Sequence, residues 1–171
     1  MPENQTGKIN RRKNSFGQCY FHQAETPSVA EEVYEIDYSR TFYLFDVVPM
    51  GAVRMSQSDK WKTNPNHFDP KKREREAVTR YRYFKSVIRN QANEMKFELK
   101  GVLEIVFLVP MPSTWSEKKK QRENKKPVKT RPDIDNYVKA FMDAIAAEDG
   151  YVWKINAEKR YAFKGSILVY A

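Results

Sequence analysis

The sequence predicts an α/β domain with a mixed sheet of four or five strands and two main helices. Three stretches carry this prediction. Residues 102–109 are almost continuously apolar, as in a central strand that is buried on both faces. Residues 70–93 and 135–147 instead repeat their apolar side chains at the spacing of one helix face. A strand between two amphipathic helices is typical of this fold class.

Further strands are predicted on either side of these elements. Residues 41–48 are β-branched and aromatic, and Pro49 and Gly51 end the stretch, so we expect a strand there. Residues 52–70 are read as an irregular loop. Gly150 marks the end of the second helix. Residues 151–153 are predicted as a short strand and residues 165–170 as the last one, with Trp153 in the core rather than serving as a base-stacking platform.

The length of the chain and its net charge indicate the number of domains and the class of binding partner. A chain of 171 residues is long enough for one domain with a real core, which we place at residues 41–171. Residues 1–40 are predicted to be a basic, partly disordered extension. The net charge of +9 and the isoelectric point near 9.5 favour a polyanionic partner such as nucleic acid.

Several classes are excluded or disfavoured. The single cysteine, Cys19, excludes an internal disulfide and a cysteine-based zinc cluster, and two histidines make a multi-histidine metal site improbable. The beginning of the chain lacks the apolar segment of a secretion signal, and no apolar run approaches the roughly 18 residues of a membrane span. We therefore expect a cytoplasmic protein without a membrane segment.

Residues 131–143 hold the candidate reaction centre. Pro132 keeps the preceding residue extended, and a helical apolar period begins directly after it. Asp133 and Asp135 therefore lie at a helix start, where two nearby carboxylates repel each other unless a cation or a shared proton intervenes. One alternative is an N-cap and an acid favoured by the helix dipole. Two acids followed by Asn136 and Lys139 instead favour a site for Mg²⁺, which prefers carboxylate oxygens.

Two further residues share a flank of this helix with Asp135. Lys139 lies one turn later, where it could orient a carboxylate, neutralise a scissile phosphate or help a leaving group. The alternative is an ordinary ion pair between Lys139 and Asp135. Asp143 continues the stripe, either as an acid that supports the metal ligands or as an ordinary exposed residue.

Two basic loops are candidates for contact with nucleic acid. Residues 113–131 are poor in apolar side chains, contain only two acids, and lead directly into Asp133. Such a loop is too basic and too long for a plain connection, so it predicts phosphate binding. The candidate phosphate-binding residues are Arg54, Lys60 and Lys62 in the loop 52–70, and Lys118, Lys119, Lys120, Lys129 and Arg131 in the loop 113–131.

Residues 131–145, followed by Val152 and Trp153, resemble the signature of RusA-type endodeoxyribonucleases, the Holliday-junction resolvases common in prophages. Residues 49–61 and 110–115 resemble other motifs of phage members, so the resemblance covers about residues 41–170. It implies a RusA-like fold and a homodimer that uses Mg²⁺ or Mn²⁺ to cut four-way DNA junctions symmetrically. It also implies that Asp133 and Asp135 are metal ligands and that Lys139 is the catalytic lysine.

The sequence departs from the family pattern at one position. Many members place an acidic pair just after the tryptophan, and Asn156 stands where the second acid is expected. An asparagine carbonyl can ligate Mg²⁺ but adds no negative charge, so metal affinity is expected to fall. Glu158, Asp149 or Asp143 could compensate, and Glu158 is the preferred candidate.

The sequence thus predicts a Mg²⁺-dependent, structure-selective endodeoxyribonuclease of prophage origin that resolves Holliday junctions in recombination and repair. Two alternatives stay open. One is a catalytically weak or inactive junction-binding protein of the same fold. The other is a basic RNA-associated module in which the acids only cap a helix. Convergence of Asp133 and Asp135 with a third acid would favour the nuclease.

Overall fold

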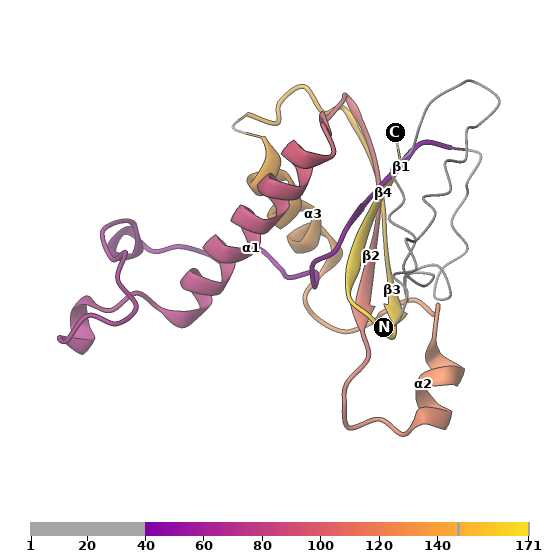
Figure 1. Ribbon diagram of the computed structural model, residues 1–171, viewed down its shortest axis with the longest axis horizontal. Coiled ribbons are helices and arrows are strands. Elements are labelled where there is room, and N and C mark those ends of the chain that lie inside the picture. The colour runs from indigo at the N-terminus through magenta and orange to yellow at the C-terminus, as the bar shows by residue number, and fades with distance from the viewer. Residues whose placement is uncertain (1–39, 147, 171) are drawn as a thin grey trace, which may run out of the picture.

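The computed structural model describes residues 40–146 and 148–170, which form an α/β fold (Figure 1). The predicted extension, residues 1–40, lies outside the described residues except for Arg40. In chain order the elements are β1 (Phe42–Phe45), η1 (Gln57–Lys60), η2 (Pro70–Lys72), α1 (Glu76–Glu94), β2 (Val102–Pro110), α2 (Glu117–Glu123), α3 (Ile134–Ile145), β3 (Lys154–Ala162) and β4 (Ser166–Tyr170), where η1 and η2 are 3₁₀ turns.

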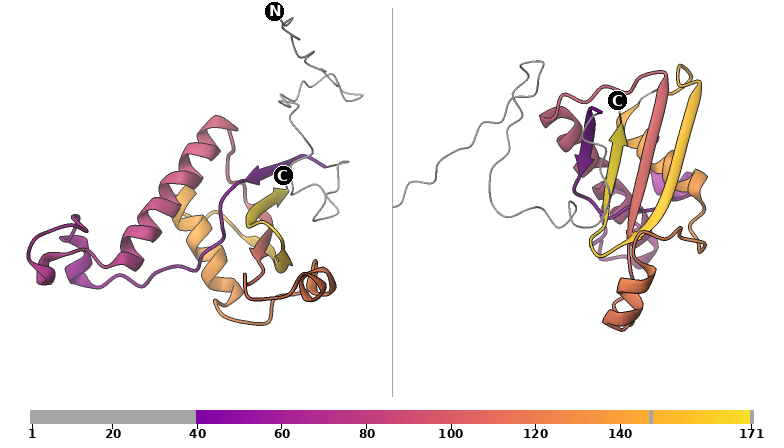
Figure 2. Two further views of the ribbon diagram at one scale, coloured as in Figure 1. Left: turned by 60° about the horizontal axis from the view of Figure 1, so that its bottom comes forward. Right: turned by 90° about the vertical axis from the view of Figure 1, so that its right-hand side faces the viewer.

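The four strands form a mixed sheet, as the sequence predicted, and the structure gives their order as β1-β4-β2-β3 (Figure 2). β2 and β3 are parallel, whereas β4 is antiparallel to both β1 and β2. Parallel strands need a crossover connection, and α2 and α3 lie in it. After β3 the chain passes the end of β2 to reach β4. Gly165 allows this close passage, because a Cβ there would lie 3.1 Å from Pro110 Cδ and from Val48 Cα.

The main core lies between α1, α3 and one face of the sheet, where aromatic rings meet edge to face. The ring centroids of Phe45 and Phe141 are 5.2 Å apart, and those of Phe45 and Phe97 are 5.6 Å apart. Phe107 on β2 stacks with Tyr137 on α3 at 5.3 Å. Such pairs stabilise a core beyond the area they bury. α3 is therefore held against the sheet along its length.

Polar contacts join α1 to the far half of α3. The Tyr81 hydroxyl donates to Asp143 Oδ2 at 2.8 Å, and Arg89 Nε donates to the carbonyl oxygen of Ala144 at 2.8 Å. Burial, followed by the hydrogen bond to Asp143, raises the pKa of Tyr81, so the phenol stays protonated. Asp143 is thus not the ordinary exposed residue that was one alternative from the sequence, because its carboxylate connects α3 to α1.

Residues 54–75, here called the arm, project away from the sheet at the far end of α1 (Figure 1). The sequence predicted an irregular loop, and the structure adds the short turns η1 and η2. Arg75, the last residue of the arm, joins it to η1 by donating to both carboxylate oxygens of buried Asp59. The arm is therefore a built element rather than a loose connection.

The sequence-based prediction misplaced the edge strand and missed a helix. Residues 151–153 precede β3 and are not a strand. Trp153 is 75% exposed, so the prediction that it lies in the core is wrong. Its indole instead packs close to Gly101, where a Cβ would come within 2.8 Å of Nε1. The loop 113–131 contains α2, which the lack of apolar side chains concealed.

The aromatic core yields a stability prediction. Phe141 is fully buried between Phe45 and Phe97, so Phe141→Ala leaves a cavity and should lower the free energy of unfolding by about 3–5 kcal/mol. Tyr83→Ala, at a position that is 70% exposed, should change it by less than about 0.5 kcal/mol. Urea denaturation measures both. Equal losses in the two variants would contradict this account of the core.

Candidate active site

Asp133 and Asp135 lie at the start of α3, as predicted. Asp133 is the N-cap residue but makes no side-chain capping hydrogen bond, and Asp135 lies in the first turn. Both side chains are exposed. Within residues 40–146 and 148–170, neither carboxylate has a hydrogen-bond or ion-pair partner. The structure thus leaves both carboxylates available, and capping does not account for Asp133.

Lys139 is exposed one turn after Asp135 on α3. The alternative of an ion pair between the two is not realised, and the Lys139 ammonium has no partner in the described part of the chain. An unpaired ammonium beside unpaired carboxylates can contact a phosphate without first breaking a salt bridge.

The loop after β1 lies against the start of α3. The backbone N–H of Ala52 donates to the carbonyl oxygen of Asn136 at 2.9 Å. A Cβ on Gly51 would lie 2.8 Å from Pro132 Cβ, so only glycine fits this approach without displacing the turn. The peptide before Pro132 is cis. Residues 49–54, which resemble a family motif, are thereby brought next to Asp133.

Lys159 on β3 holds the backbone that precedes Asp133, and the sequence analysis missed it. Its Nζ donates to the carbonyl oxygens of Thr130 and Pro132, each at 2.7 Å. The same ammonium lies 5.9 Å from the ring centre of Tyr137. Nothing in the sequence signalled it clearly, because charged side chains hide the alternation of β3. In the structure Lys159 falls on the same face as Ala157, which packs on the main core.

Asn156 and Glu158 occupy the alternate positions of β3, so their side chains point to the sheet face opposite Ala157 and Lys159. Glu158 Oε2 accepts from Arg160 Nε at 2.6 Å. In the described chain no three acidic, histidine or cysteine side chains lie together as a metal site. Glu158 therefore does not join Asp133 and Asp135 in this structure, and neither does Asp143, which is bonded to Tyr81.

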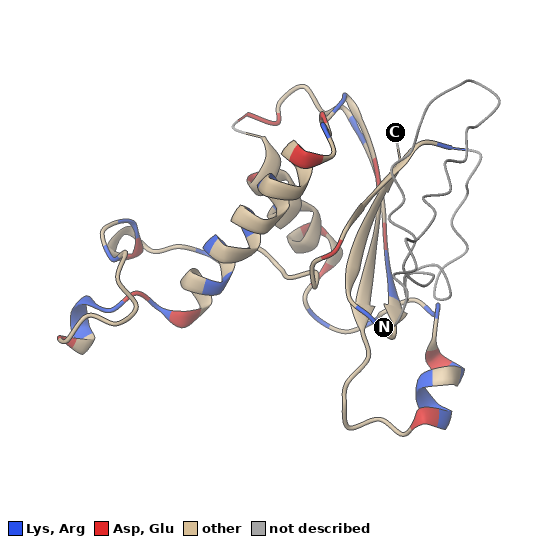
Figure 3. Cartoon of the chain, viewed as in Figure 1, with Lys and Arg blue, Asp and Glu red and all other residues tan. Residues whose placement is uncertain are grey.

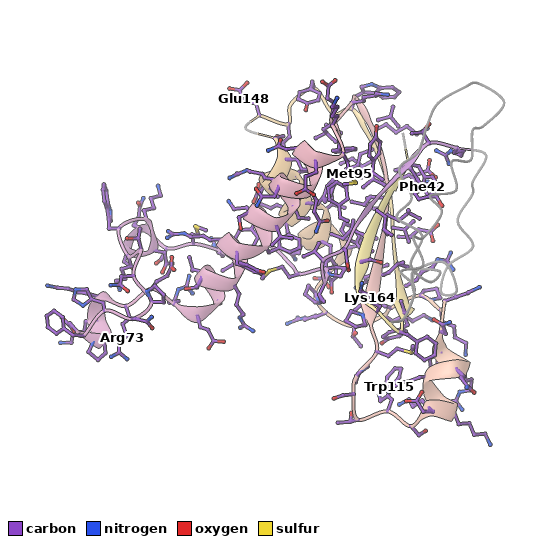
Figure 4. The ribbon with its side chains drawn as sticks, in the orientation of Figure 1. Phe42, Arg73, Met95, Trp115, Glu148 and Lys164 are labelled. Atoms are coloured by element: carbon purple, nitrogen blue, oxygen red, sulfur yellow. The ribbon has the colours of Figure 1, made fainter. Side chains whose placement is uncertain are left out.

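Lys and Arg positions lie on α2, on the loop that leads into α3, and on the arm (Figure 3). On α2, Lys120 pairs with Glu117 at 2.8 Å, and Lys119 Nζ lies 4.0 Å from the ring centre of Trp115. Trp115 and α2 project beyond the sheet in Figure 4. Exposed side chains without an acidic partner in the described chain are those of Lys118, Lys129 and Arg131 in this region, and Arg54 and Lys60 on the arm, where Lys62 is half-buried.

A comparison with protein families places these residues in one domain. The family model described as Endodeoxyribonuclease RusA matches residues 46–169, most of the chain. The chain belongs to the RusA endodeoxyribonuclease family. RusA-family proteins are Holliday-junction endodeoxyribonucleases. No curated protein and no solved structure matches the chain.

The matched range contains the start of α3, the α2 region, Lys159 and the arm. RusA-family nucleases are generally metal-dependent, and their substrate is a DNA junction. Among the residues described here, no helix is long and apolar enough to cross a membrane. Carboxylates can hold a metal ion that activates water for phosphodiester hydrolysis, and exposed carboxylates are present at the start of α3.

Lys159 yields a prediction for this RusA-family enzyme. Lys159→Ala removes the two hydrogen bonds that hold residues 130–132, so Asp133 should lose its orientation. Junction cleavage should fall roughly tenfold to a hundredfold while the junction Kd changes little. Hydrogen exchange at residues 130–136 should rise in parallel. Lys154→Ala, at an exposed position on the same strand, is the control. A normal cleavage rate with unchanged exchange would contradict the positioning role of Lys159.

Proposed function

We propose that this RusA-family member is a divalent-metal-dependent, structure-selective endodeoxyribonuclease that resolves four-way junctions in DNA recombination and repair, with Asp133, Asp135 and Lys139 at its reaction centre. The best support for this proposal is that the charged groups of the site are not bound to other residues. Two carboxylates at one helix start and an ammonium one turn later all lack partners in the described chain, although ion pairs are common elsewhere on its surface.

Asp133 and Asp135 would hold the metal ion, Mg²⁺ or alternatively Mn²⁺. They fit it because both are exposed carboxylates, and neither is occupied by a capping bond or a salt bridge. Mg²⁺ is commonly held by one or two carboxylates together with water and substrate phosphate, so the proposal does not need Asn156 or Glu158. When bound, the ion would activate a water molecule and relieve charge on the phosphoryl group.

Lys139 would contact the scissile phosphate or the leaving oxygen, because its ammonium is free and lies on the flank of Asp135. The helix start itself favours an anion, since its first N–H groups point outward. Asn136 and Asp143 serve this geometry indirectly. Asn136 connects α3 to the loop at Ala52, and Asp143 connects α3 to α1.

The surrounding cations would hold the DNA backbone. Lys129 and Arg131 lie next to Asp133 in the chain, and Lys118 is exposed on α2. Arg54, Lys60 and Lys62 extend the basic surface along the arm, whereas Lys119 and Lys120 are already engaged by Trp115 and Glu117. We further propose a homodimer, because symmetric cutting of a four-way junction needs two reaction centres and one chain supplies one.

A second candidate function is a junction-binding protein that cuts weakly. The observation in its favour is that no third acid lies beside Asp133 and Asp135 in the described chain. A site with fewer charged ligands holds a divalent ion less tightly. A native chain that binds a four-way junction but cuts it slowly at saturating Mg²⁺ would favour the second candidate. Stronger competition by RNA than by junction DNA would favour the RNA-associated alternative.

The metal-site assignment predicts separate effects on cutting and binding. Asp133→Asn or Asp135→Asn should abolish cleavage of a synthetic four-way junction in Mg²⁺ or Mn²⁺. Binding in EDTA should stay the same or tighten, because a negative charge near phosphate is removed. Glu98→Gln, at an exposed acid between α1 and β2, is the control. Wild-type cutting rates in either active-site variant would remove the assignment.

The basic surround predicts a change in salt dependence. Lys118→Ala combined with Lys129→Ala should weaken binding to every DNA form and lower the slope of log affinity against log salt by about one per lost phosphate contact. Lys100→Ala, an exposed lysine next to the start of β2, serves as the charge control. An unchanged slope in the double variant would show that these lysines do not touch phosphate.

A further inference from the structure

The arm, residues 54–75, presents two aromatic rings to solvent. Trp61 is 85% exposed and Phe68 is 86% exposed. The imidazole of His67 stacks on Phe68, with ring centroids 4.6 Å apart and 25° between the planes. Apolar groups gathered on an exposed surface are a feature of interaction sites, whereas single scattered ones are normal.

Hydrogen bonds and ion pairs hold the base of the arm. Asp59 is 1% exposed and accepts from the side chain of Arg75 and from both the backbone N–H and the hydroxyl of Ser56. These bonds, the one from Arg75 foremost, hold the pKa of Asp59 well below its usual range. Arg82 on α1 pairs with Glu74 and donates to the carbonyl oxygen of Asp59. The exposed rings therefore sit on a preorganised support.

The charge around the rings is positive. The buried acids Asp59 and Glu74 are already paired with arginines. Within the described chain, the ammonium groups of Lys60, Lys62, Lys71 and Lys72 have no acidic partner. A hollow of about 390 Å³ beside Trp61 is lined by Ser58, Trp61, Lys62, Thr63, Asn64, His67 and Lys72. Arg73, labelled in Figure 4, lies in the arm and donates from Nε to the carbonyl oxygen of His67 at 2.6 Å.

We propose that the arm is a second nucleic-acid site that binds unpaired nucleotides, with bases stacked on Trp61 and Phe68 and phosphates on the lysines. Flat rings among unpaired cations are the combination that single-stranded nucleic acid requires, because each base has a face for stacking and each phosphate a negative charge. Bases in a regular duplex keep their faces covered by their neighbours, so the rings would select unstacked bases.

A second copy of the chain is the competing occupant, and the charges disfavour it. Two such arms would bring the unpaired ammonium groups of four lysines together from each copy, and in the arm only Asp69 is an acid without an arginine partner. The proposed site is also separate from the start of α3. Its binding can be measured without metal and without cutting, so it stands whether or not Asp133 and Asp135 act as proposed.

Binding in EDTA tests the arm. The full chain is titrated against a fluorescein-labelled oligothymidylate and against a duplex of equal length, with anisotropy as the readout. Trp61→Ala and Phe68→Ala should each weaken binding of the single strand by roughly tenfold and binding of the duplex by less than about twofold. Trp153→Ala, a 75% exposed tryptophan outside the arm, should change neither.

Fluorescence distinguishes stacking from charge alone. Oligothymidylate should quench the tryptophan emission of the native chain, and Trp61→Phe should remove most of this quenching while the affinity falls only about twofold to threefold. The unfolding midpoints of the variants should equal that of the native chain, because the exposed rings add little to the core.

Three results would overturn the proposal. The first is unchanged single-strand affinity in both alanine variants. The second is an equal loss on single strand and duplex, which would make the arm a general phosphate contact. The third is a lower molar mass of Trp61→Ala in size-exclusion light scattering, which would make the arm an interface between two copies of the chain.

Discussion

The parallel pairing of β2 with β3 is the constraint on which the candidate active site depends. Parallel neighbours cannot be joined by a tight turn, so the chain must cross back over the sheet between Pro110 and Lys154, and α3 makes that crossing. The same pairing aligns Lys159 with Phe107, and Lys159 reaches the carbonyl oxygens just before Asp133. The position of both carboxylates thus follows from sheet topology.

Two kinds of charged residue serve different purposes in this protein. Some are paired and hold elements together, such as Asp59 with Arg75 at the base of the arm and Asp143 with Tyr81 between α1 and α3. Others have no partner in the described chain and cluster where α3 begins. An unpaired charge adds little to folding, and this is why the proposal gives these residues a role in binding metal and phosphate.

The strongest sequence patterns were the most reliable predictors. The apolar run of β2 and the helical period of α3 appear in the structure within one residue or a few of their predicted bounds. β3 was missed because it is an edge strand with charged side chains at Lys154, Glu158 and Arg160, which hide its alternation. Trp153 was assigned to the core because it is apolar. It is exposed because it directly precedes Lys154, the first residue of the edge strand β3.

The sequence by itself determined the fold class, the family and the two aspartates at a helix start, because each rests on local spacing along the chain. Only the tertiary structure decided what surrounds them. Lys159 and Gly51 are far from Asp133 in sequence and meet its backbone or its neighbour Pro132 through the sheet and the loop after β1. The tertiary structure also decided which face of the sheet the side chains of Asn156 and Glu158 point to. A strand turns successive side chains to opposite faces, and linear alignment does not show which face α3 covers.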